Sequence, residues 1–104
     1  LEEGLRMEEH PGVVFRSGPA GRRAALASGP DVWQVITVFR ELDERGEEAI
    51  ALTSSLTGRD ADQVRVAVRY YAAYDTEIDS WIEANERAAS EAELAWRREQ
   101  GLPA

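Results

Sequence analysis

The stretch EEAIALTSSLTGRDADQVRVAVRYY, residues 47–71, decides the fold that the sequence predicts. Two amphipathic segments flank Gly58, and glycine most easily takes the left-handed conformation that ends one helix before the next begins. Asp60 and Gln63 have the spacing of a capping box, which marks the start of the second helix. We therefore expect a short helix, a tight turn and a longer helix over residues 60–73, which is the outline of a helix-turn-helix.

Residues 32–45, upstream of this pair, predict a supporting helix. Apolar side chains recur there at three- and four-residue spacing, which gives a helix one buried face. Asp31, directly after a proline, is typical of a helix start, and Gly46 is expected to end the helix. Further upstream, residues 13–16 and 22–27 are extended segments on either side of a turn cluster, which predicts a two-stranded hairpin. A lone hairpin is marginally stable in water, so we expect it to pack on the helices or on a second chain.

From Asp75 to about Gln100 the sequence predicts a fourth helix, about 39 Å long at 1.5 Å per residue. Its apolar stripe begins with Ile78, Trp81 and Ile82, which can pack on the domain, and continues mainly as alanine. An alanine face with Trp96 near its end favours docking in a groove of a partner protein, because tryptophan is common at interface hot spots. A solvated terminal helix is the alternative.

These segments predict a mainly α-helical fold with a short N-terminal β-hairpin, a three-helix helix-turn-helix core and a long C-terminal helix. The length of 104 residues fits one domain. We expect a flexible N-terminus over residues 1–9, where no pattern is visible. In this interpretation residues 10–74 form the hairpin and helix-turn-helix domain, and residues 75–104 form the C-terminal helix, a partner-binding arm.

The composition excludes most enzyme classes. The chain has no cysteine and one histidine, His10, so thiol nucleophiles are absent and a transition-metal site has almost no ligands. No hydroxyl residue has a base placed to activate it, and no glycine-rich loop opens directly into a helix. We therefore expect a protein that is not an enzyme and has no cofactor, no metal and no small-molecule substrate. The absence of a long apolar run adds the expectation of a cytoplasmic protein that does not enter a membrane.

The charge is unevenly distributed along the chain. There are 20 acidic residues and 12 basic ones, all of them arginine, for a formal charge of −8. Residues 12–30 contain three arginines and no acid, whereas residues 31–104 contain 16 acids and eight arginines. A basic front on an acidic body suggests two kinds of partner, because opposite charges steer association.

The predicted second helix of the pair offers residues that suit DNA. Gln63 pairs well with adenine and Arg65 with guanine in the major groove, and Arg59 is placed to meet a phosphate. On this helix we expect Tyr71 in the core and Tyr70 on the exposed face. The candidate DNA-binding residues are Arg16, Arg22, Arg23, Arg59, Gln63, Arg65 and Arg69. The alternative is an ordinary small helical core with solvated arginines, which the acidic flanks of the helix favour.

Three stretches resemble a known family: HPGVVFR at residues 10–16, GRRAALASGPDVW at 21–33 and VRVAVRYYAAYDTEIDSW at 64–81. Together they are similar to a VapB-like family of bacterial type II antitoxins, formerly described as a domain of unknown function, over about residues 10–83. The resemblance implies an N-terminal hairpin before a helix-turn-helix, a homodimer, binding to operator DNA and inhibition of a cognate toxin, often a PIN-domain ribonuclease. The Ser-Gly-Pro-Asp at residues 28–31 departs from the usual Gly-Thr-Arg of the family, and it weakens the DNA-binding part.

In such antitoxins the N-terminal regions commonly pair, the C-terminal helix wraps around the toxin, and a basic side chain often occupies the acidic site of the nuclease. The resemblance therefore implies an antitoxin that also regulates its own transcription. The candidate partner-binding residues are Trp81, Ile82, Arg87, Trp96, Arg97 and Arg98. A protein-interaction module without a DNA role, or the dimerisation domain of a larger assembly, is the alternative function.

Overall fold

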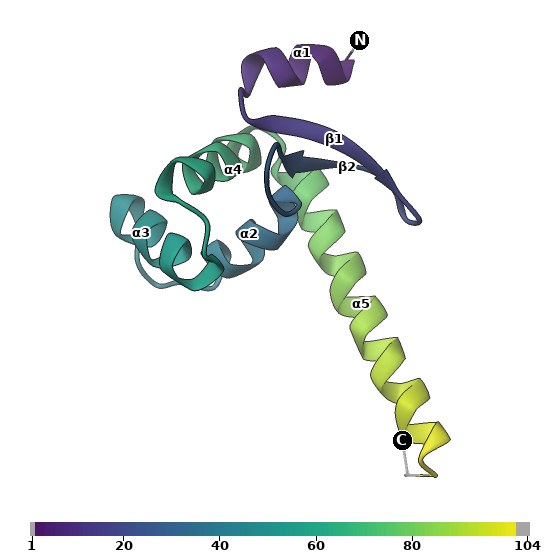
Figure 1. The fold of residues 1–104 in the computed structure, drawn as a ribbon. Coiled ribbons are helices and arrows are strands. Elements are labelled where there is room, and N and C mark those ends of the chain that lie inside the picture. The colour runs from purple at the N-terminus through teal and green to yellow at the C-terminus, as the bar shows by residue number, and fades with distance from the viewer. Residues whose placement is uncertain (1, 102–104) are drawn as a thin grey trace.

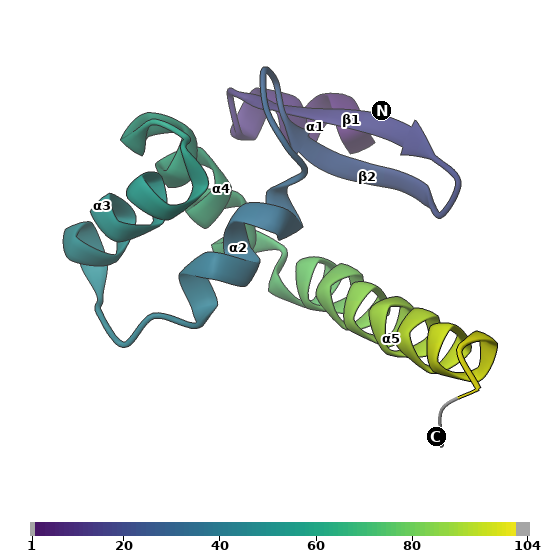
Figure 2. The same cartoon turned by 60° about the horizontal axis from the view of Figure 1, so that its bottom comes forward.

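The computed structural model describes residues 2–101; residues 1 and 102–104, from the two expected end segments, lie outside it. In chain order its elements are α1 (Glu2–Glu9), β1 (Val13–Gly18), β2 (Gly21–Leu26), α2 (Val32–Arg40), α3 (Gly46–Thr57), α4 (Ala61–Ala73) and α5 (Asp75–Glu99). The hairpin lies between α1 and the helices α2 and α4, and α5 runs away from the domain as a single rod (Figure 1, Figure 2). The expected mainly helical fold, with an N-terminal hairpin and a long C-terminal helix, is confirmed.

The hairpin packs on the core through its open end. β1 and β2 pair antiparallel from Val13 opposite Leu26 to Gly18 opposite Gly21, so the connecting turn is only two residues long. Val13 and Leu26 are buried, whereas the turn at the other end is exposed. The support that an isolated hairpin lacks in water thus comes from the same chain.

The core lies where α2, α4, the hairpin and the first turns of α5 meet. Val64, Ala67 and Tyr70 recur every three residues on α4 and are fully buried. The expectation that Tyr71 is buried and Tyr70 exposed is wrong, because Tyr70 continues this buried line and Tyr71 is only half-buried. A tyrosine can be buried when its hydroxyl group finds hydrogen-bond partners, and the hydroxyl group of Tyr70 finds two.

The turn between α3 and α4 forms as expected, but one helix boundary moves. Gly58 is left-handed, with a φ of 71°, and the capping box at Asp60 is present. The supporting helix, expected over residues 32–45, ends at Arg40. Acidic residues follow directly, and carboxylates oppose the negative end of a helix dipole. Gly46 opens α3 and does not end α2.

The N-terminal segment departs most clearly from the sequence interpretation. Residues 1–9 are expected to be flexible and without pattern, yet Glu2–Glu9 form α1, which packs on β1. The Arg6 guanidinium lies 2.9 Å from the Tyr70 hydroxyl oxygen and 2.7 Å from Glu77 Oε1. These partners lie 64 and 71 residues further along the chain, so no local pattern reveals them.

Candidate partner-binding arm and helix pair

The helix pair α3–α4 is built as the sequence predicts. α3 ends at Thr57, Gly58 turns the chain, α4 starts at Ala61, and α2 packs on both helices. This is the order of elements in a helix-turn-helix core. Whether the surface suits DNA depends on what its polar side chains already bind.

Arg65, the candidate for contact with guanine, is held by two carboxylates. Its guanidinium lies 2.5 Å from Glu47 Oε1 on α3 and 2.8 Å from Asp62 Oδ1 one turn earlier on α4. The hydrogen bond from Arg65 lowers the pKa of Glu47 below its ordinary value, which is the direction expected for a carboxylate paired with a cation. The charge of Arg65 is therefore balanced, and the start of α4 presents acid where a phosphate would approach.

Gln63 and Arg59 are also used within the chain. Gln63 caps α4, and its side-chain nitrogen donates to Ser28 Oγ at 3.2 Å. Arg59 donates to the carbonyl oxygen of Ser28 at 3.5 Å, so both side chains brace the loop between β2 and α2. Both are half-buried in this position. To contact a base edge, both side chains would have to break these hydrogen bonds to Ser28.

The three arginines of the hairpin have partners of their own. Arg16 donates to three backbone carbonyl oxygens of the β2–α2 connection, at 2.9 to 3.2 Å. Arg22 binds Glu3 of α1 at 2.9 Å, and Arg23 forms an ion pair with Asp31. Two of the three positive charges of this basic front are therefore paired with carboxylates, and the guanidinium of Arg16 is hydrogen-bonded to the backbone.

Arg69 differs from the other six candidates for DNA contact. Its side chain is exposed on α4, and within residues 2–101 it makes no ion pair or side-chain hydrogen bond. One free cation does not make a surface for phosphate. The ion pair between Arg65 and Asp62 could have been predicted from the sequence, because Asp62 stands three residues before Arg65, at the spacing of a helical ion pair.

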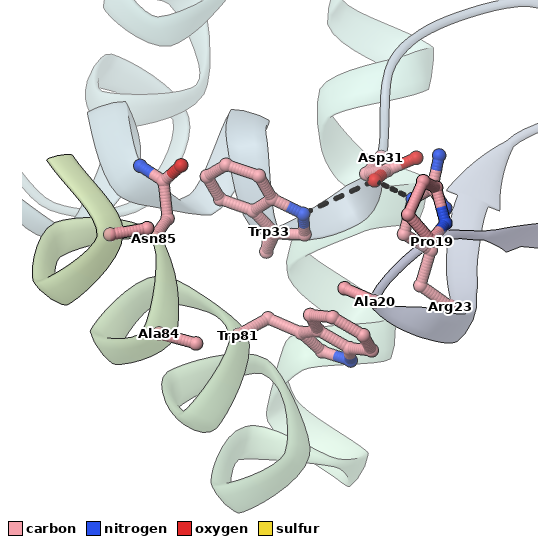
Figure 3. A pocket seen from close by; sticks show the side chains of 9 residues that line it. Pro19, Ala20, Arg23, Asp31, Trp33, Trp81, Ala84 and Asn85 are labelled. Carbon is pink, nitrogen blue, oxygen red and sulfur yellow. Dashed lines mark hydrogen bonds and ion pairs between the residues drawn. The ribbon is translucent and has the colours of Figure 1, made fainter. Parts of the chain in front are cut away.

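A cavity of about 420 Å³ opens between the hairpin turn, the start of α2 and the first half of α5 (Figure 3). Trp33 of α2 and Trp81 of α5 line it, and Ala20 of the hairpin turn lies beside the Trp81 ring. Ala84 and Ala88 continue its wall along α5. The sequence did not predict this cavity, because the hairpin turn and α5 meet only in the fold.

One end of the cavity is closed by a polar group. Asp31 accepts a hydrogen bond from Trp33 Nε1 at 3.2 Å and pairs with Arg23 (Figure 3). Asp31 is buried, and a buried carboxylate needs such a partner. Arg23 therefore holds Asp31 in place, and Asp31 in turn orients the Trp33 ring. The open part of the cavity is mainly apolar.

α5 has two halves with different surroundings. Ile78 and Ile82 are buried in the domain, and Trp81 is half-buried in the wall of the cavity. From residue 83 to residue 101 every side chain is exposed, Trp96 by 54%. Ile82 was a candidate for partner binding, but the structure makes it a core residue.

The remaining partner-binding candidates lie on the exposed half of α5. Its three arginines are Arg87, Arg97 and Arg98. Arg97 pairs with Glu93 one turn earlier at 3.0 Å, and exposed pairs of this kind are weak enough for a partner to displace. Trp81 and Trp96 are fifteen residues apart, about 22 Å along the helix axis. The candidates therefore follow one another along a rod and do not converge on one point.

A polar and aromatic cluster fixes the direction of this rod. The Tyr70 hydroxyl group donates to Glu77 on α5 at 2.8 Å, and Arg6 of α1 lies 4.0 Å from the centre of the Tyr74 ring. His10 packs edge-on against Tyr70, with ring centres 5.4 Å apart. Burial and the hydrogen bond to Glu77 raise the pKa of Tyr70, so its hydroxyl group stays protonated as the donor. The first turns of α5 are thereby tied to α1 and α4.

Comparison of the chain with protein-family models, with curated proteins and with solved structures finds no match. The antitoxin resemblance therefore stays a prediction that rests on the quoted residues. Within residues 2–101, no three His, Asp or Glu side chains gather as a metal site. Over the same range, no helix is long and apolar enough to cross a membrane.

Proposed function

We propose that this chain is a non-catalytic partner-binding protein, the antitoxin of a type II toxin–antitoxin pair, and that α5 is its inhibitory arm. One observation carries the proposal: α5 continues for 17 residues beyond Ile82, and every side chain in this part of the helix is exposed. A helix of this kind gains little stability from its own sequence and is stabilised by a partner that covers its apolar face.

The chemistry of the arm fits a nuclease partner. Its apolar face ends in the exposed Trp96, and a large aromatic side chain is the usual anchor of a protein interface. Its last two turns add a pair of neighbouring cations, Arg97 and Arg98. Guanidinium groups bind carboxylates in a bidentate geometry, so they suit the acidic metal-binding site of a PIN-type ribonuclease. The arm would inhibit by occupying that site.

Operator binding is the second half of the antitoxin proposal, and its geometric support is weaker. The order of α2, α3 and α4 suits a helix-turn-helix, but six of the seven candidate residues already have partners in the chain. This observation favours the second candidate function, an interaction module without a DNA role. The two candidates share the arm and differ in the surface of α4.

Co-expression with the product of the neighbouring gene tests the proposal. The full chain should co-purify with that product and restore growth, whereas a chain that ends after Glu83 should do neither. This truncation keeps the buried Ile78 and Ile82, and circular dichroism should confirm that the domain is folded.

The matched control is the full chain with Arg65→Gln and Arg69→Gln, which changes only the surface proposed for DNA. It should still restore growth. A truncated chain that neutralises the toxin as well as the full chain would overturn the role of the arm. A neighbouring product that is harmless and forms no complex would overturn the antitoxin assignment.

A further inference from the structure

The exposed half of α5 carries an apolar face that continues the cavity wall. Trp81, Ala84 and Ala88 line the cavity, and Ala92 and Ala95 follow at the same three- and four-residue spacing. This spacing puts them on one side of the helix, and the charged residues of the exposed half lie mostly on the other. Alanine side chains let a second helix approach closely, at an axis separation of about 8 Å. The face therefore fits another helix.

The charges along α5 select the direction of that helix if it is a second copy of the same arm. Residues 75–86 hold five acids and no arginine, whereas residues 87–99 hold three arginines and three acids. Two arms in the same direction would set the acidic halves side by side. Two arms in opposite directions place the half that carries Arg97 and Arg98 alongside the acidic half of the other copy, which is the complementary arrangement of charge.

The spacing of the two tryptophans sets the register of such a pair. The midpoint between Trp81 and Trp96 falls between Ala88 and Ala89. A two-fold axis at that point places two small side chains where the helices cross and puts Trp96 of each copy beside Trp81 of the other. The cavity between Trp33 and Trp81 measures about 420 Å³, which is room for one more indole ring.

An alanine-lined helix pair by itself buries little apolar area. A stable dimer buries about 800 Å² on each partner, and a buried tryptophan supplies about 150–250 Å². Insertion of Trp96 would cover two exposed apolar features at once, the Trp96 ring and the open cavity. A second copy of the chain would therefore account for both the exposed ring and the open cavity.

We propose that two free chains pair arm to arm and antiparallel through α5, with Trp96 of each copy seated in the Trp33–Trp81 cavity of the other. Each cavity is complete only when the second copy supplies this ring. The proposal concerns the chain without a toxin and does not rest on the antitoxin assignment. A toxin that binds the same face would replace the second copy.

Sedimentation equilibrium on the full chain tests the pairing. We expect a dimer, and Trp96→Ala should raise its dissociation constant by tenfold or more because each interface loses two inserted rings. Leu94→Ala is the matched control, since Leu94 is also exposed on the arm but lies on the charged side; it should leave the constant unchanged. A monomeric parent chain, or a dimer that Trp96→Ala does not weaken, overturns the proposal.

Cysteine cross-linking tests the direction, and the natural chain contains no cysteine to interfere. Ala88→Cys lies next to the proposed two-fold axis and should form an intermolecular disulfide on oxidation. Ala95→Cys should not, because seven residues place it about 10 Å from the axis and about 20 Å from its copy. Cross-linking at both positions would indicate parallel arms. Cross-linking at neither position would indicate a dimer through another surface. Either result contradicts the proposal.

Discussion

α4 and the exposed half of α5 are both amphipathic helices with arginines, but they differ in what already occupies them. On α4 the apolar face is buried and Arg65 is held by Glu47 and Asp62. On α5 beyond Ile82, every side chain as far as residue 101 is exposed. From the sequence alone, both helices are candidate binding surfaces. The fold shows that most polar candidates on α4 have partners within the chain, whereas the second half of α5 is exposed.

The largest expected effect is on the free energy of unfolding, and it compares a buried side chain of α4 with an exposed one of α5. Tyr70→Ala should lower the free energy of unfolding by about 3–5 kcal/mol, because it leaves a cavity among α1, β1, α4 and α5. Trp96→Ala, measured in the folded monomer, should change it by less than about 0.5 kcal/mol, as expected for an exposed site. Urea unfolding at a concentration below dimer formation measures both. Similar losses for the two variants would mean that the arm packs on the domain in solution.

A smaller effect tests whether α1 is part of the domain. Arg6→Gln should cost about 1–3 kcal/mol, because Tyr70 and Glu77 lose a charged hydrogen-bond partner in a half-buried setting. Arg22→Gln is the matched control, since its ion pair with Glu3 is exposed, and no measurable change is expected. If both variants behave like the parent chain, α1 does not anchor α5.

The pH dependence of stability probes the same cluster. Burial raises the folded-state pKa of Tyr70 above the ordinary value of 10.0. The folded chain then holds this proton where the unfolded chain releases it, so the stabilisation is complete below about pH 10 and is lost as the pH rises further. In Tyr70→Phe the free energy of unfolding should fall less steeply with rising pH than in the parent chain. Tyr71→Phe should reduce this slope less, because Tyr71 is less buried. An unchanged alkaline profile in Tyr70→Phe would contradict the assigned burial.

The smallest effect concerns DNA. The parent chain should bind a duplex weakly, with little dependence on salt. Glu47→Gln with Asp62→Asn should release Arg65 and steepen the salt dependence by about one unit, the contribution of one added phosphate contact. Fluorescence anisotropy across a salt series measures this. Tight and steeply salt-dependent binding by the parent chain would make α4 a working DNA surface and remove the contrast with α5.

Local rules were enough to predict the α3–α4 turn and the hairpin. Gly58 and the capping box of Asp60 and Gln63 act over a few residues, so their geometry can be read from spacing. The hairpin likewise depends on a short turn between two extended segments. These elements form from neighbours in the chain, and the sequence prediction agrees with them.

The features that the sequence did not reveal depend on distant partners. Arg6 and Glu77 are 71 residues apart, and Arg65 and Glu47 are 18 apart on different helices. From the sequence alone Arg65 was a candidate for DNA contact, whereas in the fold it pairs with Glu47. The cavity between Trp33 and Trp81 joins α2 to α5, so it exists only after folding.

The central claim is that the apolar face of the arm is the functional surface, and growth rescue by two single variants tests it most directly. Trp96→Ala and Leu94→Ala each remove one exposed apolar side chain from the same stretch of α5, on opposite sides. Co-expressed with the neighbouring gene product at equal protein level, Leu94→Ala should restore growth like the parent chain and Trp96→Ala should fail. Equal rescue by both variants would contradict the account.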